Sequence, residues 1–221
     1  MNKTPSRILL VAALFGSAKA ANLALDGTYA YTTGPMPVFS GGTWYRDDDP
    51  TLGDHTGYTT AGSYSDGDLN DGEIFSSGNP VFVGSPIVAW DPVNVTPIPV
   101  TIVFDLGTLA DITSVKINSF IRTDFALGAP DDYNLSFSTD NVTFTPESTV
   151  ATGFPFTTGD VNHTQAVTEQ ARYVRLSFDG DSNGGDKFSL TEISIEGTAV
   201  PEPSMFSILA IGMLALVRRK R

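Results

Sequence analysis

Acidic and polar side chains crowd residues 179–186, DGDSNGGD, at a spacing that suits a cation. Asp179, Asp181 and Asn183 would supply oxygen ligands at positions one, three and five of a twelve-residue calcium loop, and a glycine follows at position six. Position twelve is Leu190, where such a loop needs a bidentate Glu, and strand-like sequence flanks the segment. We therefore expect a solvated hairpin loop with weak affinity for a cation.

Residue types that carry catalysis are scarce. His55 and His163 are the two histidines, and the sequence has no Gly-x-Ser-x-Gly elbow, His-Glu-x-x-His motif or Gly-rich phosphate loop. Carboxylates are so numerous that any pair could be proposed for glycoside hydrolysis, so their number carries no information. We expect a protein that is not an enzyme; a hydrolase with an unrecognised site is the remaining catalytic alternative.

The charge of the chain restricts its partners. The sequence has 25 Asp and Glu against 13 Lys and Arg, yet only six of the basic residues lie between residues 21 and 200. Such an acidic body repels phosphate backbones, so we exclude nucleic acid as a partner. Adaptation to a salty environment would explain the same charge. With no cysteine, the body must be held by its core, by a metal ion, or by both.

Alternating apolar and polar residues, rich in β-branched and aromatic types, predict strands. The clearest runs are residues 100–107, 114–121, 132–139, 172–178 and 188–197. In the fourth run, Val174, Leu176 and Phe178 should face the core. No convincing helical period occurs between the termini, so we expect an all-β jelly roll or sandwich over residues 21–198. Residues 33–99 should form ordered loops across one end of it.

The N-terminus reads as an export signal. Lys3 and Arg7 precede the apolar stretch ILLVAALFG, and small residues follow in SAKA. This order is typical of a signal peptide over residues 1–20, cleaved after Ala20. The alternative is a buried N-terminal helix, which would need a polar face and a cap that the stretch lacks.

The C-terminus, residues 199–221, has three parts: Pro201-Glu202-Pro203, a thirteen-residue apolar run over 205–217, and a basic RRKR tail. As a helix the run would span about 20 Å, less than the roughly 30 Å of a bilayer core. The segment resembles the PEP-CTERM sorting signal. That resemblance implies export by a Gram-negative bacterium, a transient stop in the inner membrane, and cleavage by an exosortase. An ordinary short tail anchor is the alternative.

Six further stretches, in order, resemble the galactose-binding-like jelly roll of discoidin, or coagulation factor V/VIII type C, domains. They are NLALDGTYAYT (22–32), YSDGDLNDG (64–72), IVFDLG (102–107), YNLSFSTDNVTFT (133–145), ARYVRLSF (171–178) and LTEISIEG (190–197). The chain departs from the family pattern at three places. Asn70 replaces a Thr, and Asn141 replaces a Gly of the turn. Phe144 replaces a Trp, and as an aromatic residue Phe144 should likewise lie in the core.

This resemblance implies a calcium ion held by the carboxylates of Asp71 and Glu192 with backbone carbonyls from residues 68–73. In the alternative, Asp71 merely caps its own turn and Glu192 is solvated. The resemblance also implies carbohydrate binding at loops of one end, where aromatic rings stack on sugars and polar groups reach hydroxyls. The candidates are Trp44, Tyr45, His55, Arg122, Asp124 and Phe125.

The function that these features imply is a noncatalytic module that binds extracellular polysaccharide or glycoconjugate at the cell surface or in the extracellular matrix. The alternative is a structural or adhesive matrix protein without specific sugar binding, which associates through cations bridging its acidic surface.

Overall fold

The computed structural model describes residues 20–33, 68–74, 87–90, 99–180 and 187–201. Within these ranges, regular structure consists of strands and one short 3-10 helix, η2 (Thr123–Phe125). The strands are β1 (Ala21–Asn22), β2 (Thr28–Thr33), β3 (Val88–Trp90), β4 (Val100–Ile121), β5 (Leu127–Gly128), β6 (Asp132–Ser138), β7 (Ser148–Ala151), β8 (Gly159–Phe178), β9 (Lys187–Leu190) and β10 (Glu192–Ala199).

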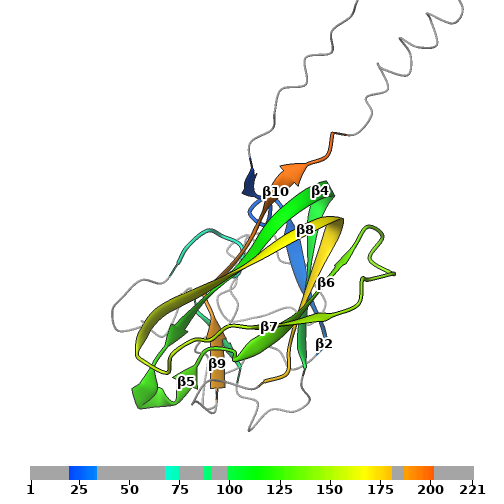
Figure 1. The fold of residues 1–221 in the computed structure, drawn as a ribbon. Coiled ribbons are helices and arrows are strands. Elements are labelled where there is room, and N and C mark those ends of the chain that lie inside the picture. The colour runs from blue at the N-terminus through cyan, green and yellow to red at the C-terminus, as the bar shows by residue number, and fades with distance from the viewer. Residues whose placement is uncertain (1–19, 34–67, 75–86, 91–98, 181–186, 202–221) are drawn as a thin grey trace, which may run out of the picture.

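The strands form two sheets (Figure 1). The large sheet has the order β1-β10-β4-β8-β6-β7, and β2 also pairs with β4; the small sheet has the order β3-β9-β5. Two strands pair with the same edge of β4: β2 pairs with residues 101–105 and β10 with residues 110–118. The expected all-β sandwich is confirmed by these two sheets.

The core lies between the sheets. The expected inward residues Val174, Leu176 and Phe178 are all fully buried. Across the sandwich, the rings of Phe178 on β8 and Phe188 on β9 lie 5.7 Å apart between centroids, and those of Tyr31 on β2 and Trp90 on β3 lie 6.1 Å apart. Aromatic pairs at this separation add about 0.5–1.5 kcal/mol beyond their buried area, so the small sheet is held to the large one by ring contacts as well as by burial.

Two predicted strand boundaries were wrong. Residues 100–107 and 114–121 are one strand, β4, since β8 pairs with both halves and the ladder resumes after an irregularity between Asp105 and Ala110. Residues 188–197 are two strands, because the chain leaves the small sheet after Leu190 and enters the large sheet at Glu192. The first half of β8, residues 159–171, was not predicted as a strand.

A β-bulge in β10 explains why residue 197 is a glycine. The register between β10 and β4 shifts at Glu196 and Gly197. A Cβ atom added to Gly197 would lie 2.6 Å from the backbone oxygen of Asp111, so no other residue fits without moving the neighbouring strand. The bulge therefore depends on glycine.

Both ends of the folded body lie together. Ala21 pairs with Gly197 through β1 and β10, and the amide of Val200 donates a 2.8 Å hydrogen bond to the Leu109 carbonyl. Figure 1 shows this end of the molecule far from β5. The two terminal segments thus join the body at the same pole.

Candidate functional site

A tight loop follows the end of β4 and connects it to β5. The amide of Arg122 donates to the Leu127 carbonyl at 2.8 Å, and the amide of Leu127 donates back to the Arg122 carbonyl at 3.1 Å. The single turn of η2 lies between them, and Ala126 closes it in the left-handed conformation with φ 52°. This backbone places residues 122–125 on one tight loop.

Three of the predicted sugar-contacting residues meet at this loop. The guanidinium of Arg122 donates from Nε and Nη2 to the two carboxylate oxygens of Asp124, both at 3.1 Å, and its Cζ lies 4.1 Å from the Phe125 ring centroid. The Arg122 side chain is 15% exposed and the Asp124 side chain 59%. The planar edge of Arg122 that we expected to hold a ligand therefore holds Asp124, and the exposed groups are the carboxylate and the ring. We call these three side chains the loop-tip cluster.

The other three predicted sugar contacts, Trp44, Tyr45 and His55, lie outside the described residues. The calcium-loop-like segment also lies outside from residue 181 onward. Their expected roles stay predictions.

The predicted calcium ligands lie at a second location, where the turn of residues 68–73 meets the start of β10. The amide of Gly72 donates to Oε2 of Glu192 at 3.2 Å, and the amide of Ile193 donates to the Leu69 carbonyl at 2.9 Å. Asp71 lies close enough for its charge to act on Glu192. The structure thus brings together two residues more than a hundred positions apart, and we call this place the Glu192 junction.

Glu192 is an unusual carboxylate, because it is 1% exposed and, within the described part of the chain, its Oε1 has no hydrogen-bond partner. Burial raises its pKa to about 8, and the neighbouring Asp71 charge adds to this rise. The hydrogen bonds from Gly72 and Asn22 and the charge of Lys116 oppose it. An ionised carboxylate in this position would be costly without a positive partner.

A calcium ion fits this donor set. Calcium binds carboxylate and carbonyl oxygens, and the unpartnered Oε1 of Glu192 is such an oxygen beside a second carboxylate. Within the described ranges no group of three or more Asp, Glu, His or Cys side chains is placed so that it could hold a metal ion. Asp71 and Glu192 would therefore supply the side-chain ligands, and the remaining oxygens would come from backbone carbonyls.

The alternative stated for Asp71 and Glu192, a turn cap and a solvated carboxylate, is right for Asp71 and wrong for Glu192. Asp71 does cap its own turn, since its Oδ1 accepts the Glu73 amide at 2.7 Å. Glu192, however, is buried and not solvated, so the alternative is wrong for that residue.

Sequence analysis missed the structural role of Asn70 at this junction and placed Phe144, in another part of the fold, wrongly. Asn70 is 1% exposed and its Nδ2 donates to the carbonyls of Ala24 at 2.9 Å and Gly27 at 3.3 Å, which ties the turn to the segment before β2. Phe144 was expected in the core, but it is half-buried and lies under Arg175, whose Cζ is 4.2 Å from the ring centroid. The hairpin turn leaves Phe144 on the outer face of the sheet, where a cation covers it.

The termini are described only where they join the body. Ala20 and Pro201 are exposed, whereas Glu202, Pro203 and the apolar run lie outside the described residues. Among the described residues, no helix is long and apolar enough to cross a membrane.

The PEP-CTERM protein-sorting motif matches residues 199–221. The expected sorting signal is confirmed by this match, which indicates a secreted protein handled by an exosortase at the membrane. No curated protein matches the chain.

Several solved structures are similar to the chain. One is the C-terminal domain of a chitobiase from Bacteroides fragilis, at 14% identity and TM-score 0.48, covering 83% of this chain and all of that one. Another is a family 32 carbohydrate-binding module from Clostridium perfringens, in complex with galactose, at 16% identity and TM-score 0.46, covering 80% of this chain and 98% of that one. The fold assignment itself rests on the strands and sheets described above.

Proposed function

We propose that the β-sandwich is a noncatalytic module that binds extracellular polysaccharide or glycoconjugate. The observation that carries the proposal is the loop-tip cluster, which places an aromatic ring, a cation and an exposed carboxylate on one tight loop. Phe125 is 37% exposed, so its ring can stack on the C–H face of a sugar. Asp124 would accept hydrogen bonds from sugar hydroxyls while Arg122 holds it in place.

Recognition at this loop would be shallow. Trp44, Tyr45 and His55 are the proposed further contacts, and they would enlarge the stacking surface. Affinity at a single shallow site is expected to be weak, so useful binding would come from repeated sites on a polymer.

The position of the termini supports a role outside the cell. The body makes its last described backbone hydrogen bond at Val200, and the exposed Pro201 begins the sorting motif. Cleavage by an exosortase near this motif would leave the sandwich intact. The β5 end, which carries the loop-tip cluster, lies away from the pole where the two ends of the folded body meet (Figure 1). We propose that the released or tethered module acts at the cell surface or in the extracellular matrix.

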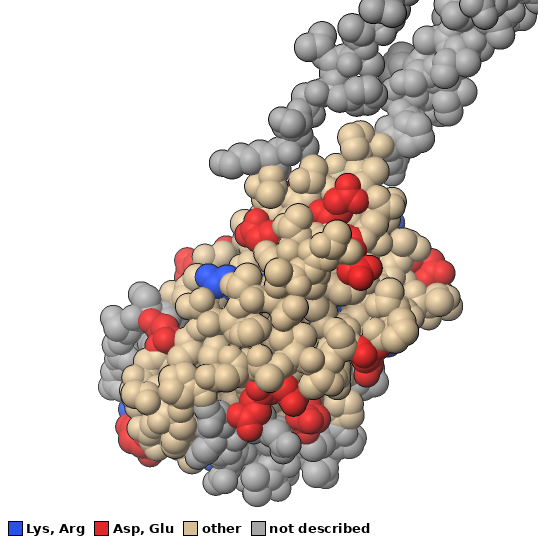
Figure 2. All heavy atoms as spheres, viewed as in Figure 1, with Lys and Arg blue, Asp and Glu red and all other residues tan. Residues whose placement is uncertain are grey.

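The surface charge supports uncharged or cationic partners over polyanions. Figure 2 shows Asp and Glu side chains spread over the visible face, with few Lys or Arg among them. The formal net charge of the chain is −12. Nucleic acid and strongly acidic polymers would be repelled by such a surface.

Calcium is proposed as a structural ion at the Glu192 junction. Bound there, it would neutralise Asp71 and Glu192 and fix the turn of residues 68–73 against β10. The ion would stabilise the fold and take no part in chemistry.

A glycan array, run with calcium and with chelator, tests the function. We expect saturable binding that Phe125→Ala and Arg122→Ala abolish, because each removes part of the loop-tip cluster. Val142→Ala is the matched control, since Val142 is 82% exposed and lies in another hairpin. A blank array together with calcium-driven oligomerisation would contradict the proposal and favour the structural matrix protein.

A further inference from the structure

The outer face of the large sheet carries a groove of about 480 Å³. Six polar side chains from β2, β4, β6 and β8 and from the segment before β7 line it, and we call it the sheet-face groove: Thr32, Thr101, Asn134, Glu147, Arg175 and Ser177. Ligand sites in proteins typically measure about 300–1,000 Å³, so the groove is large enough for a ligand. Neither the loop-tip cluster nor the Glu192 junction contributes to it.

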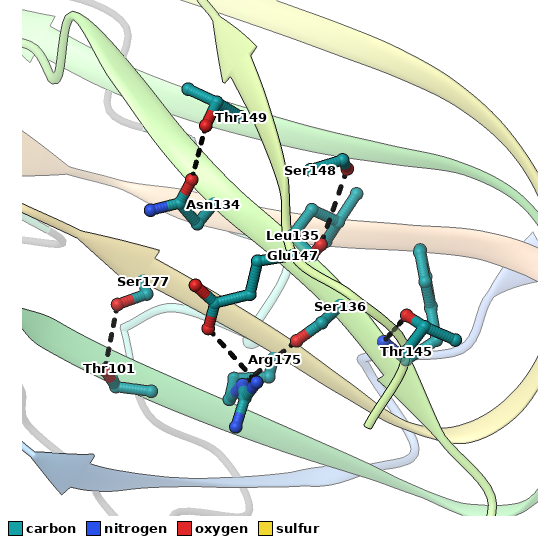
Figure 3. Close-up of polar contacts among 11 residues, drawn as sticks. Thr101, Asn134, Leu135, Ser136, Thr145, Glu147, Ser148, Thr149, Arg175 and Ser177 are labelled. Atoms are coloured by element: carbon teal, nitrogen blue, oxygen red, sulfur yellow. Dashed lines mark hydrogen bonds and ion pairs between the residues drawn. The ribbon is translucent and has the colours of Figure 1, made fainter. Parts of the chain in front are cut away.

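The floor of the groove is a row of short polar side chains that crosses the sheet. The register pairs Thr101 with Ser177, Ser177 with Asn134, and Asn134 with Thr149. Thr101 Oγ1 lies 3.0 Å from Ser177 Oγ, and Thr149 Oγ1 donates to Asn134 Oδ1 at 2.7 Å (Figure 3). Short side chains lose little entropy on binding, and hydroxyls can both donate and accept. The row therefore suits a ligand that is itself rich in hydroxyl groups.

One wall of the groove is a fixed guanidinium. Arg175 donates from Nε to Ser136 Oγ at 2.9 Å and from Nη2 to Glu147 Oε1 at 3.1 Å (Figure 3). Its Cζ also lies 4.2 Å from the centroid of the Phe144 ring. These three contacts hold the guanidinium and the carboxylate in one arrangement before any ligand arrives. Preorganisation of this kind lowers the entropic cost of binding.

The groove continues along the sheet. A second hollow of about 170 Å³ shares Thr32 with it and is also lined by Asp105, Asn141 and Tyr173. The paired residues Thr101 and Ser177 line the first hollow, and the paired residues Asp105 and Tyr173, four positions along the same two strands, line the second. Together the two hollows, which we call the trough, extend farther along the sheet than a single sugar needs. The shape therefore favours a chain of several units.

The lining distinguishes among classes of occupant. Pro99 is the one wholly apolar residue among the described residues that line the larger groove, and the other side chains there carry hydroxyl, amide or charged groups. Arg175, the one cation among the described residues that line the groove, is already paired with Glu147, so an anionic chain would find no free positive charge there. We propose that the sheet-face groove is a second binding site, which takes a neutral, hydroxyl-bearing glycan chain along the trough.

This site is separate from the loop-tip cluster. Thr101 lies at the start of β4, whereas Arg122 follows its last residue, so the two sites lie at opposite ends of a 22-residue strand. A module with two sites could bind two chains, or one long chain twice, and would bind a polymer far better than a short oligosaccharide.

Amide chemical-shift mapping tests the proposal with a panel of neutral linear hexasaccharides of glucose, galactose, mannose and xylose. We expect at least one to shift the amides of Thr101, Asn134, Arg175 and Ser177, and to bind about tenfold tighter than its disaccharide. Arg175→Ala should weaken this binding about tenfold, and Asn134→Ala should weaken it to a smaller extent. Glu169→Ala is the matched control, because Glu169 is an exposed charged residue of the same strand and lines neither hollow.

The outcomes separate the two sites. Groove shifts that persist in Phe125→Ala support the second site, and they do so even if the loop tip binds nothing. Shifts confined to residues 122–127 would overturn the second site and leave the proposed function standing. Wild-type affinity in both Arg175→Ala and Asn134→Ala would overturn it, as would tighter binding of an acidic galacturonate hexamer or no groove shift with any neutral hexasaccharide.

Discussion

The Glu192 junction and the sheet-face groove differ in whether their charged side chains have partners. At the junction, a carboxylate is 1% exposed and, among the described residues, one of its oxygens has no partner. At the groove, Glu147 and Arg175 are partly exposed and bonded to each other. At the junction one carboxylate oxygen of Glu192 is left for a ligand, whereas at the groove Glu147 and Arg175 neutralise each other without a ligand.

This difference separates stability from binding. A buried group that lacks a partner costs folding free energy, and whatever neutralises it restores that free energy. A satisfied surface pair contributes at most about 1 kcal/mol, so its loss changes the fold little. Changes at the junction should therefore appear in melting curves, and changes at the groove should appear in binding.

The largest expected effect is that of calcium and pH on Glu192. Its folded pKa of about 8 exceeds the ordinary value of 4.5, so without calcium its protonated form stabilises the protein below pH 4.5. That contribution is lost as pH rises through 8. At about 1.4 kcal/mol per pKa unit, the loss amounts to a few kcal/mol.

Calcium needs the ionised carboxylate, so the difference in Tm between calcium and chelator should grow from pH 5 to pH 8 and reach about 10 °C. Glu192→Gln should remove both the calcium response and this pH dependence, and Glu147→Gln, at an exposed carboxylate, is the control. A wild-type melt that is indifferent to calcium and chelator at pH 8 would show that the junction binds no calcium.

The second effect concerns the amide that ties the junction together. Asn70→Ala removes the donor from the carbonyls of Ala24 and Gly27 and leaves a buried space, so we expect a loss of about 2–3 kcal/mol in chemical denaturation. Asn134→Ala, at an amide of the groove, should cost less than about 1 kcal/mol because Asn134 is only partly buried. Equal losses in the two variants would contradict the contrast between the regions.

The sequence predicts strands well where one face is fully buried. Residues 132–138 and 172–178 show a strong period of two, and the structure has β6 and the end of β8 there. The start of β8 was missed because its inner face is only half-buried, so polar residues such as His163 and Gln165 occupy positions that a core would fill with apolar ones. The change of sheet at Thr191 coincides with a break in the alternation, since the polar pair Thr191 and Glu192 separates Leu190 from Ile193, but a bulge within one strand would give the same local pattern.

The Glu192 junction and the sheet-face groove also differ in how far the sequence could predict them. Asp71 and Glu192 could be paired through resemblance to a family motif, because each lies in a recognisable segment. Burial of Glu192 could not be foreseen from a strand residue that looks polar. The pairing of Arg175 with Glu147 depends on the register of β6 with both β7 and β8, and that register is set by contacts far apart in sequence. The groove therefore became visible only in three dimensions.

The smallest expected effect belongs to Asp105, a carboxylate of the sheet face whose behaviour should be the reverse of that of Glu192. Arg172 donates from Nε and Nη2 to its two oxygens at 2.7 and 2.8 Å, and this hydrogen-bonded pair lowers the pKa of Asp105 below 3.8. The stabilisation is therefore present above the unfolded pKa and is lost as pH falls through the lower folded value. Both side chains are about one third exposed, so solvent screening limits the cost of Asp105→Asn to about 1 kcal/mol or less.

Urea denaturation of wild type and Asp105→Asn from pH 2 to pH 7 measures this directly. The two proteins should differ at neutral pH and converge at the acid end, while Glu192→Gln differs from wild type most strongly at high pH in chelator. Because the Asp105 pair is partly exposed, 1 M salt should reduce its contribution, whereas the desolvated Glu192 should be little affected. A difference between wild type and Asp105→Asn that grows toward low pH would contradict the assignment of Asp105 as a satisfied surface carboxylate.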